Sequence, residues 1–193
     1  SDFVAKYIQS CEVTHVFELV GGMITHLLDS ISQTNISIVS CHHEQAAAFS
    51  AEGYARISGK PGIALATSGP GATNLLTAIG SCYFDSVPSI FITGQVNIHE
   101  LKGSRGIRQL GFQETDIVSM VKPICKFVYQ VQKASELPNI LEHAFCLSLH
   151  GRQGPCLIDI PMNVQSEEVD DILANSYIQR AYNKCQESVN SNL

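Results

Sequence analysis

Short β-rich runs alternate with helical patterns along most of this chain, and no other feature limits its possible folds so strongly. The runs typical of strands are 14–20, 36–40, 62–68, 89–94, 124–131 and 156–161. Segments with the length and pattern of helices lie between them, at 23–31, 45–58, 72–84 and 134–150. Strands separated by such helices need crossover connections, which build a parallel sheet covered on both faces. We therefore predict a three-layer α/β/α fold with a mostly parallel sheet of about six strands.

The length of the chain and its apolar content suit one domain with a large core. The chain has 193 residues, of which 45% are hydrophobic and 16% charged. Residues 62–66 and 156–160 are almost continuously apolar, as expected for strands buried on both faces. After Pro161 the pattern weakens into an acidic stretch and a polar tail without periodicity. We expect the domain to occupy 1–165 and the segment 166–193 to begin a linker towards a further domain.

Charge and cysteine content exclude several classes of partner. The formal net charge of -6 provides no basic surface for nucleic acid or for an anionic membrane. No run is apolar enough to span a bilayer, and no signal segment is visible. The seven cysteines form no CxxC pair, which favours reduced thiols over a disulfide framework or a zinc site. We expect a cytoplasmic protein that binds neither nucleic acid nor membrane.

Two glycine-containing turns follow predicted strands, at the edge of a parallel sheet where ligands bind. Gly21 and Gly22 come after the first strand, and their missing side chains would let the backbone approach a ligand closely. Residues 67–74, with the sequence TSGPGATN, join the third strand to a helix. This second turn matches neither common phosphate-binding motif, so a purely structural turn is a real alternative at both places.

Glu44 stands at the junction between a strand and an alanine-rich helix whose opening is nearly free of charge. It could simply favour the helix start through the macrodipole. It could ligate a metal together with His42, although no third ligand at a suitable spacing is evident. It could instead be an acid desolvated by its apolar neighbours, which can exchange a proton near neutral pH. For His42 and His43 we favour packing or capping over catalysis.

The longest recognisable pattern covers residues 41–96, and 111–126 and 151–165 extend it. These segments resemble, in order, the N-terminal pyrimidine-binding domain of thiamine-diphosphate enzymes of the acetolactate synthase-like family. The resemblance implies a transferase or lyase that decarboxylates a 2-oxo acid and ligates carbon. A glutamate at the position of Glu44 would hydrogen-bond N1' of the cofactor's aminopyrimidine and promote proton loss from C2 of the thiazolium. Glu44 is then the catalytic residue, and the cofactor does the harder chemistry.

The resemblance also implies the other residues of the site. The expected cofactor-binding residues are Val20, Gly21, Glu44, Thr67, Pro70, Gly71, Asn74 and Gln113. Phe112 and Gln113 would face the substrate, although core packing is the alternative for Phe112. Gln95 is expected to shape the end of its strand. No metal ligand is expected in this chain.

The same resemblance implies that the chain holds about half of a site. Members of the family bind Mg²⁺ and the cofactor's diphosphate on another domain, which belongs to the same or a partner chain and carries a Gly-Asp-Gly motif absent here. We therefore expect a homodimer or higher homo-oligomer, and no turnover by this chain alone. A natural small subunit of a split decarboxylase and a non-catalytic module with the same fold are the alternatives. The residues do not decide whether FAD also binds.

Two segments depart from the usual acetolactate synthase pattern. Leu19, Val20, Gly21 and Gly22 stand where those enzymes typically carry Tyr-Pro-Gly-Gly, and residues 103–114 also differ. Both features resemble family members of undefined substrate. The sequence therefore leaves open both the 2-oxo acid and the acceptor.

Overall fold

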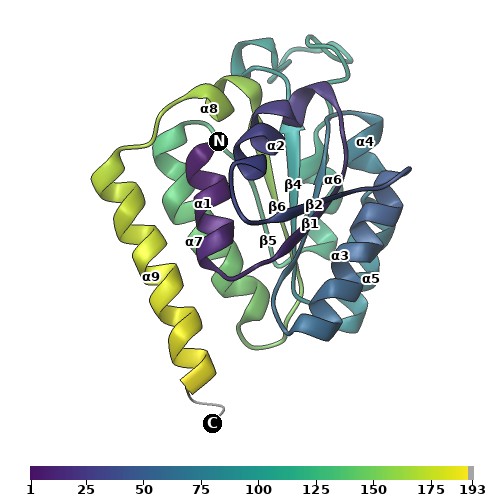
Figure 1. The fold of residues 1–193 in the computed structure, drawn as a ribbon. Helices are drawn as coiled ribbons and strands as arrows, with labels where there is room; N and C mark the ends of the chain where they lie inside the picture. The colour runs from purple at the N-terminus through teal and green to yellow at the C-terminus, as the bar shows by residue number, and fades with distance from the viewer. Residues whose placement is uncertain (191–193) are drawn as a thin grey trace.

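The structure, a computed structural model, describes the backbone of residues 1–190 and the side chains of residues 1–185. It contains one six-stranded sheet between two layers of helices (Figure 1). The strands are β1 (His15–Leu19), β2 (Ser37–Ser40), β3 (Gly62–Ala66), β4 (Ser89–Gln95), β5 (Phe127–Gln130) and β6 (Pro155–Pro161). Their order is β2-β1-β3-β4-β6-β5, and every neighbouring pair is parallel. The predicted three-layer α/β/α fold is confirmed.

The helices divide between the two faces of this sheet (Figure 1). One layer consists of α1 (Asp2–Ser10), α2 (Thr25–Ser32), α7 (Leu137–Leu149) and α9 (Asp171–Asn190). The other consists of α3 (Glu44–Ser58), α5 (Leu76–Asp85) and α6 (Ile117–Val121). Two short helices, α4 (Pro70–Thr73) and α8 (Met162–Ser166), follow β3 and β6. Turns of 3-10 helix are η1 (Gly22–Ile24), η2 (Ile98–Glu100), η3 (Lys122–Ile124) and η4 (Ala134–Glu136).

The alanine-rich helix α3 packs closely on the sheet because small residues form the contact. Ala47, Ala48 and Ala51 are fully buried on its inner side. A β-carbon added to Gly62 in β3 would lie 1.8 Å from the carbonyl oxygen of Ala51, so only glycine fits there. The helix ends at Gly59, whose φ of 68° is the left-handed conformation that favours glycine at a helix C-terminus. This packing fixes the first residue of α3, Glu44, relative to β1 and β3.

Two hydrophobic clusters, one on each face, hold the layers together. The central strands β3, β4 and β6 are buried along their whole length, which accounts for their apolar sequences. Each large aliphatic side chain fully buried here contributes roughly 1.5–3 kcal/mol to folding. Burial also raises the pKa of the Cys82 and Cys156 thiols to about 12, so they act as small apolar core residues.

The C-terminal segment differs from the polar, aperiodic tail expected after Pro161. Residues 171–190 form the helix α9, which packs against α1 and α7. Ala181 is buried there, and Tyr177 and Ile178 pack against the same cluster. Glu142 of α7 receives ionic hydrogen bonds from the basic side chains Arg180 and Lys184. The helical spacing was missed because small and amphipathic residues carry most of this contact, so the expectation of an aperiodic tail was wrong. The division at residue 165 remains a prediction.

Two other helical segments also differ from expectation. The helix expected over 72–84 is split into α4 and α5, because the amide of Leu75 donates to Ala72 in a tighter turn. Helix α1 was not predicted, although its buried Phe3, Val4 and Ile8 have helical spacing. The site lies at the strand ends beside α4, so the first difference matters for its geometry.

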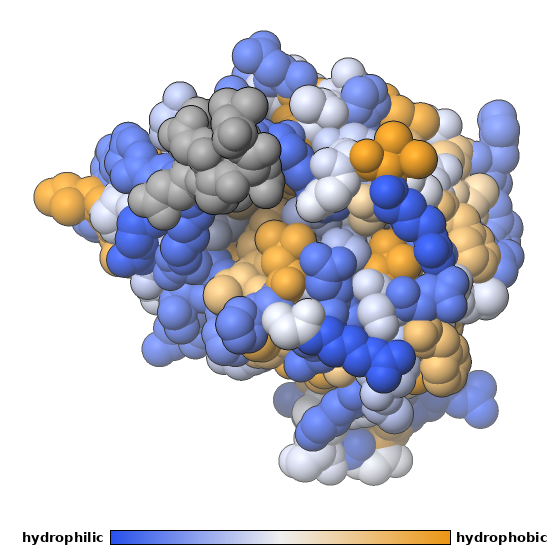
Figure 2. All heavy atoms as spheres, turned by 90° about the horizontal axis from the view of Figure 1, so that it is seen from below, coloured by the Kyte–Doolittle hydropathy of each residue, from blue (hydrophilic) through white to orange (hydrophobic). Residues whose placement is uncertain are grey.

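The side of the molecule at the amino ends of the strands has no extended hydrophobic area among the described residues. Seen from there, hydrophilic residues surround separate small hydrophobic patches (Figure 2). No helix of the described chain is both long and apolar enough to cross a membrane.

Candidate functional site

The two glycine-containing turns meet at the point where the strand order reverses. From β1 the chain crosses to β2 on one side, and β3 then lies on the other side of β1. Leu19 and Ala66, the last residues of β1 and β3, are direct neighbours in the sheet. In open parallel sheets such a switch point leaves a crevice beyond the carboxyl ends of the strands. The turns after β1 and β3 therefore lie where such a crevice is expected.

Thr67 and Gly21 hold these two turns together. A β-carbon on Gly21 would lie 2.5 Å from the Thr67 β-carbon, so a larger residue would separate the turns. The amide of Met23 also donates a 3.3 Å hydrogen bond to the Thr67 hydroxyl. Glycine at position 21 is therefore required by a close approach between the two segments.

Glu44 is the first residue of α3 and points into the molecule. His43 caps the helix by accepting a 3.1 Å hydrogen bond from the amide of Gln45 through Nδ1, which confirms capping for this histidine. The Glu44 residue is only 7% exposed, which is unusual for a carboxylate. Its Oε2 accepts a 2.8 Å hydrogen bond from Nδ2 of Asn74, at the end of α4. A simple solvent-facing helix-start acid is therefore excluded.

The other oxygen of Glu44 lies beside the glycine turn. A β-carbon on Gly71 would be 3.2 Å from Glu44 Oε1 and 2.7 Å from Cγ2 of Thr67. Within the described chain Oε1 accepts no hydrogen bond. The carboxylate thus has one oxygen fixed by Asn74 and one oxygen available to a donor. Among the described residues no group of three potential ligands is placed to hold a metal ion.

Gln113 reaches the same turn from a loop that follows β4. Its φ of 58° is unusual for a residue with a side chain, and Gly69 opposite has a φ of 68°. A β-carbon on Gly69 would be 2.7 Å from that of Gln113. The hydroxyl of Ser68 donates a 2.7 Å hydrogen bond to the Gln113 carbonyl, which ties the loop to the turn.

The remaining predicted site residues, Val20, Pro70 and Phe112, lie in the same two turns or directly before Gln113. Val20 is 64% exposed and Phe112 is 73% exposed, so both leave apolar surface uncovered. Core packing, the alternative for Phe112, is wrong. Pro70 begins α4 directly after Gly69, where its fixed φ favours a helix start. The structure thus brings Gly21, Glu44, Thr67, Gly71, Asn74 and Gln113 together through the contacts above.

The sequence analysis missed two buried polar residues near the site, Ser68 and Asp159. Ser68 lies within the glycine turn and is buried, as is Asp159 in β6. Burial raises the pKa of the Asp159 carboxyl to about 6, although hydrogen bonds from Gln130, Thr93 and Gln95 oppose the rise. An acid inside the otherwise apolar run 156–161 was the available clue. Gln95 shapes the end of β4, as expected, by accepting from the amide of Val96 at 3.1 Å.

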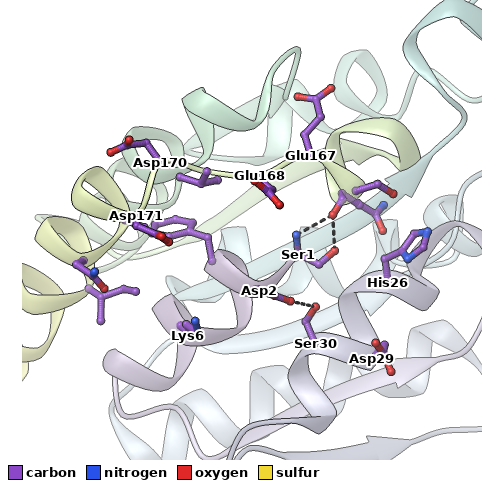
Figure 3. Close-up of a pocket in the computed structure, with 17 residues that line it drawn as sticks. Ser1, Asp2, Lys6, His26, Asp29, Ser30, Glu167, Glu168, Asp170 and Asp171 are labelled. Carbon is purple, nitrogen blue, oxygen red and sulfur yellow. Dashed lines mark hydrogen bonds between the residues drawn. The ribbon is translucent and has the colours of Figure 1, made fainter.

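A separate pocket of about 800 Å³ lies in the other helix layer (Figure 3). It is bordered by the start of α1, by α2 and by residues 165–178. Carboxylates dominate its labelled lining, and Asp2 accepts a 2.7 Å hydrogen bond from Ser30 within it (Figure 3). None of the predicted site residues lines this pocket.

The family described as "Thiamine pyrophosphate enzyme, N-terminal TPP binding domain" matches residues 1–120, which is more than half of the chain. The chain belongs to this family. Thiamine pyrophosphate is another name for thiamine diphosphate, so the resemblance found in the sequence is confirmed. The match runs from α1 into α6 and includes both glycine turns and Glu44.

Curated relatives of this TPP binding domain carry the name acetolactate synthase. The protein from Arthrospira platensis is 45% identical over 164 residues, which are 83% of this chain and 27% of that protein. The large subunit from Lactococcus lactis is 40% identical over 89% of this chain and 29% of its own length. The chloroplastic protein from Arabidopsis thaliana is 41% identical over 86% of this chain and 24% of its own. The TPP binding domain thus spans about a quarter of the length of these relatives.

Proposed function

We propose that this chain is the cofactor-activating part of a thiamine-diphosphate-dependent enzyme of acetolactate synthase type. Glu44 is its catalytic acid, and the complete enzyme decarboxylates a 2-oxo acid and joins the product to an acceptor carbonyl, as a transferase or lyase. The observation that carries this proposal is the state of the Glu44 carboxylate. It is largely buried, held through Oε2 by Asn74, and has Oε1 available beside Gly71.

The residues at the crevice fit an aminopyrimidine ring. Gly21 and Gly71 let the two turns approach each other closely, because a β-carbon on either glycine would meet Thr67, and one on Gly71 would also meet Glu44. Val20 offers exposed apolar surface for a ring face. Thr67, Pro70, Asn74 and Gln113 complete the cofactor-binding set, and Phe112 and Gln113 face the substrate. When bound, thiamine diphosphate supplies a carbon nucleophile and stores the electrons released with CO₂.

In this proposal Glu44 moves one proton at Oε1. Because Asn74 fixes Oε2, the carboxylate keeps one orientation and needs no rearrangement to meet a ring nitrogen. A buried setting also strengthens the hydrogen bond that Oε1 can make. The chain's own contribution is thus to orient Glu44, to exclude much of the water around it and to form part of the binding site for the aminopyrimidine ring.

Two apolar side chains of the proposed site are exposed in this chain, which supports the need for a second domain. No part of the described chain covers Val20 or Phe112. We propose that a diphosphate-binding domain of the same or a partner chain covers both side chains and holds Mg²⁺. A cytoplasmic homodimer or higher oligomer, inactive as this chain alone, fits that arrangement. Exposed Tyr83 and Phe84 on α5 provide apolar surface for self-association.

The test is release of CO₂ from a panel of 2-oxo acids by the complete protein. We expect release to require both thiamine diphosphate and Mg²⁺ and to vanish in the 193-residue chain alone. Cofactor-independent release, or tight binding of thiamine diphosphate without any turnover across the panel, would contradict the proposed activity.

A further inference from the structure

A chain of buried polar groups runs from β6 to the loop that carries Gln113. It begins at Asp159, which is 0% exposed in the middle of the sheet. Oδ1 of Asp159 accepts a 2.6 Å hydrogen bond from the Thr93 hydroxyl. Its Oδ2 accepts from Nε2 of Gln95 at 3.1 Å and from Nε2 of Gln130 at 2.8 Å. Both oxygens of this buried acid are therefore used as acceptors, so the charge is compensated by donors alone.

These contacts fix the orientation of the Gln95 amide. Its nitrogen must face Asp159 because both oxygens there accept, and it also donates to the Thr115 carbonyl at 2.8 Å. Its oxygen then points the other way, where it accepts from the amide of Val96 at 3.1 Å. A flipped amide would place donor against donor and acceptor against acceptor at once. Asp159 thereby determines that, at the end of β4, Gln95 directs its Nε2 to the Thr115 carbonyl and its Oε1 to the Val96 amide.

Gln95 and Ser68 together hold both sides of Gln113. The Ser68 hydroxyl lies 3.1 Å from Oε1 of Gln95 and donates to the Gln113 carbonyl at 2.7 Å. Two residues further on, the Thr115 carbonyl is held by Gln95 itself. Gln113 sits between these anchors with its positive φ, a conformation that persists only when its surroundings enforce it.

We propose that Asp159 is a positioning residue for the cofactor site: it orients Gln95, whose Nε2 holds the Thr115 carbonyl, while Ser68 holds the Gln113 carbonyl, so that the loop keeps Gln113 against the glycine turn. This rests on the proposed function, because Gln113 matters only if the crevice binds the cofactor. Asp159 is fully buried and makes its hydrogen bonds to Thr93, Gln95 and Gln130, so its proposed role is to position other residues. Its effect is transmitted by hydrogen bonds that set one loop conformation.

The chemistry of this network separates two substitutions at Asp159. In Asp159→Asn the amide oxygen can take the place of Oδ2 and accept from Gln95 and Gln130, while its nitrogen donates to the Thr93 hydroxyl. The orientation of Gln95 is then kept. Leucine has a side chain of similar size to aspartate but accepts no hydrogen bond. In Asp159→Leu two glutamine donors therefore lose their acceptor, and the Gln95 amide is free to turn. A positioning role predicts rescue by asparagine and loss with leucine.

The experiment compares the complete protein with its Asp159→Asn, Asp159→Leu and Ser68→Ala variants. Ser68→Ala is included because it removes only the second anchor of the loop, and so tests whether anchoring this loop controls cofactor binding if the leucine variant fails to fold. Two quantities are measured: the dissociation constant of thiamine diphosphate in the presence of Mg²⁺, and amide hydrogen exchange across residues 111–116. Exchange in the β3 and β4 segments reports whether the domain itself has loosened.

We expect Asp159→Leu and Ser68→Ala to weaken cofactor binding by about tenfold or more and to accelerate exchange across 111–116, with β3 and β4 unchanged. Asp159→Asn should stay within about twofold of the parent. Faster loop exchange with unaltered cofactor binding would overturn the inference. Equal losses in the asparagine and leucine variants would also overturn it. If the parent protein binds no thiamine diphosphate, the proposed function fails, and exchange alone still tests the link from Asp159 to the loop.

Discussion

The side-chain amide of Asn74 donates a 2.8 Å hydrogen bond to Oε2 of Glu44, thirty residues earlier in the chain. This contact joins the start of α3 to the end of α4, which follow β2 and β3, the strands on either side of β1. It leaves the second carboxylate oxygen facing the turn at Gly71. One interaction therefore decides which oxygen is structural and which is available for chemistry.

Replacing Asn74 with alanine should free the Glu44 carboxylate to rotate. A hydrogen bond to a charged group contributes roughly 1.5–3 kcal/mol. We therefore expect the cofactor-dependent turnover rate to fall by about tenfold or more. The measurement is cofactor-dependent turnover in the complete protein. Asn175→Ala on the exposed side of α9 is the matched control and should have no effect. Equal activity in both variants would show that Asn74 does not orient the acid.

Gly71→Ala tests the close packing of the turn against Glu44. The new β-carbon would lie 2.7 Å from Thr67 Cγ2, so the turn has to shift, at a cost of roughly 1–3 kcal/mol. Gly53→Ala in α3 is the control, because nothing lies within 4 Å of its added β-carbon. In a helix interior that change should stabilise by about 0.5–1 kcal/mol. In denaturant unfolding, the free energy of unfolding should decrease in Gly71→Ala and increase in Gly53→Ala, relative to the parent. An increase in Gly71→Ala would contradict the described geometry.

Asp159 should make stability depend on pH in an unusual direction. Burial raises its pKa to about 6, and the nearby Asp116 raises it further, so the folded state holds this proton more tightly than the unfolded chain. The stability that the group contributes is complete below its ordinary pKa of 3.8 and is lost as pH rises through about 6. The full change corresponds to roughly 3 kcal/mol.

The measurement is the free energy of unfolding from pH 4 to pH 7 in the parent and in Asp159→Asn. The stability of the parent relative to the variant should fall steadily over this range, because only the parent carries the titrating group. A difference that stays constant with pH would show that Asp159 does not titrate there.

Self-association should depend on the exposed aromatic residues of α5. Tyr83 and Phe84 form an edge-to-face pair with ring centroids 5.7 Å apart, and both are exposed. We expect sedimentation of the parent to show dimers or larger species that Phe84→Ser weakens. Ile172→Ser on α9 removes a comparably exposed apolar side chain and should change nothing. A parent that remains monomeric across the concentration series would contradict this interface.

The sequence was most informative where local pattern and burial agree. All six strands and the helix beginning at Glu44 were predictable, because runs such as 62–66 are apolar throughout and α3 has a capped start and a glycine end. The helix α9 was not, since its contacts with the fold depend on small residues such as Ala181. Its Arg180 guanidinium lies 3.9 Å over the ring of Tyr177 on the same helix.

The candidate site divides in the same way. Glu44 and the glycines stood out because an acid in an alanine-rich helix start and paired glycines at strand ends are locally unusual. The Asp159, Gln95 and Ser68 network could not be predicted, because its members come from three separate segments that only the sheet order brings together. The acid within the apolar run 156–161 marked Asp159 as unusual, but the sequence does not say which distant residues it hydrogen-bonds.

The most direct test of the role of Glu44 is exchange of the C2 proton of thiamine diphosphate for deuterium, followed by NMR in the complete protein. If Oε1 of Glu44 activates the cofactor, Glu44→Gln should slow this exchange by about a hundredfold or more while the fold is kept. An exchange rate in Glu44→Gln equal to that of the parent, with the cofactor bound in both, would remove Glu44 from catalysis.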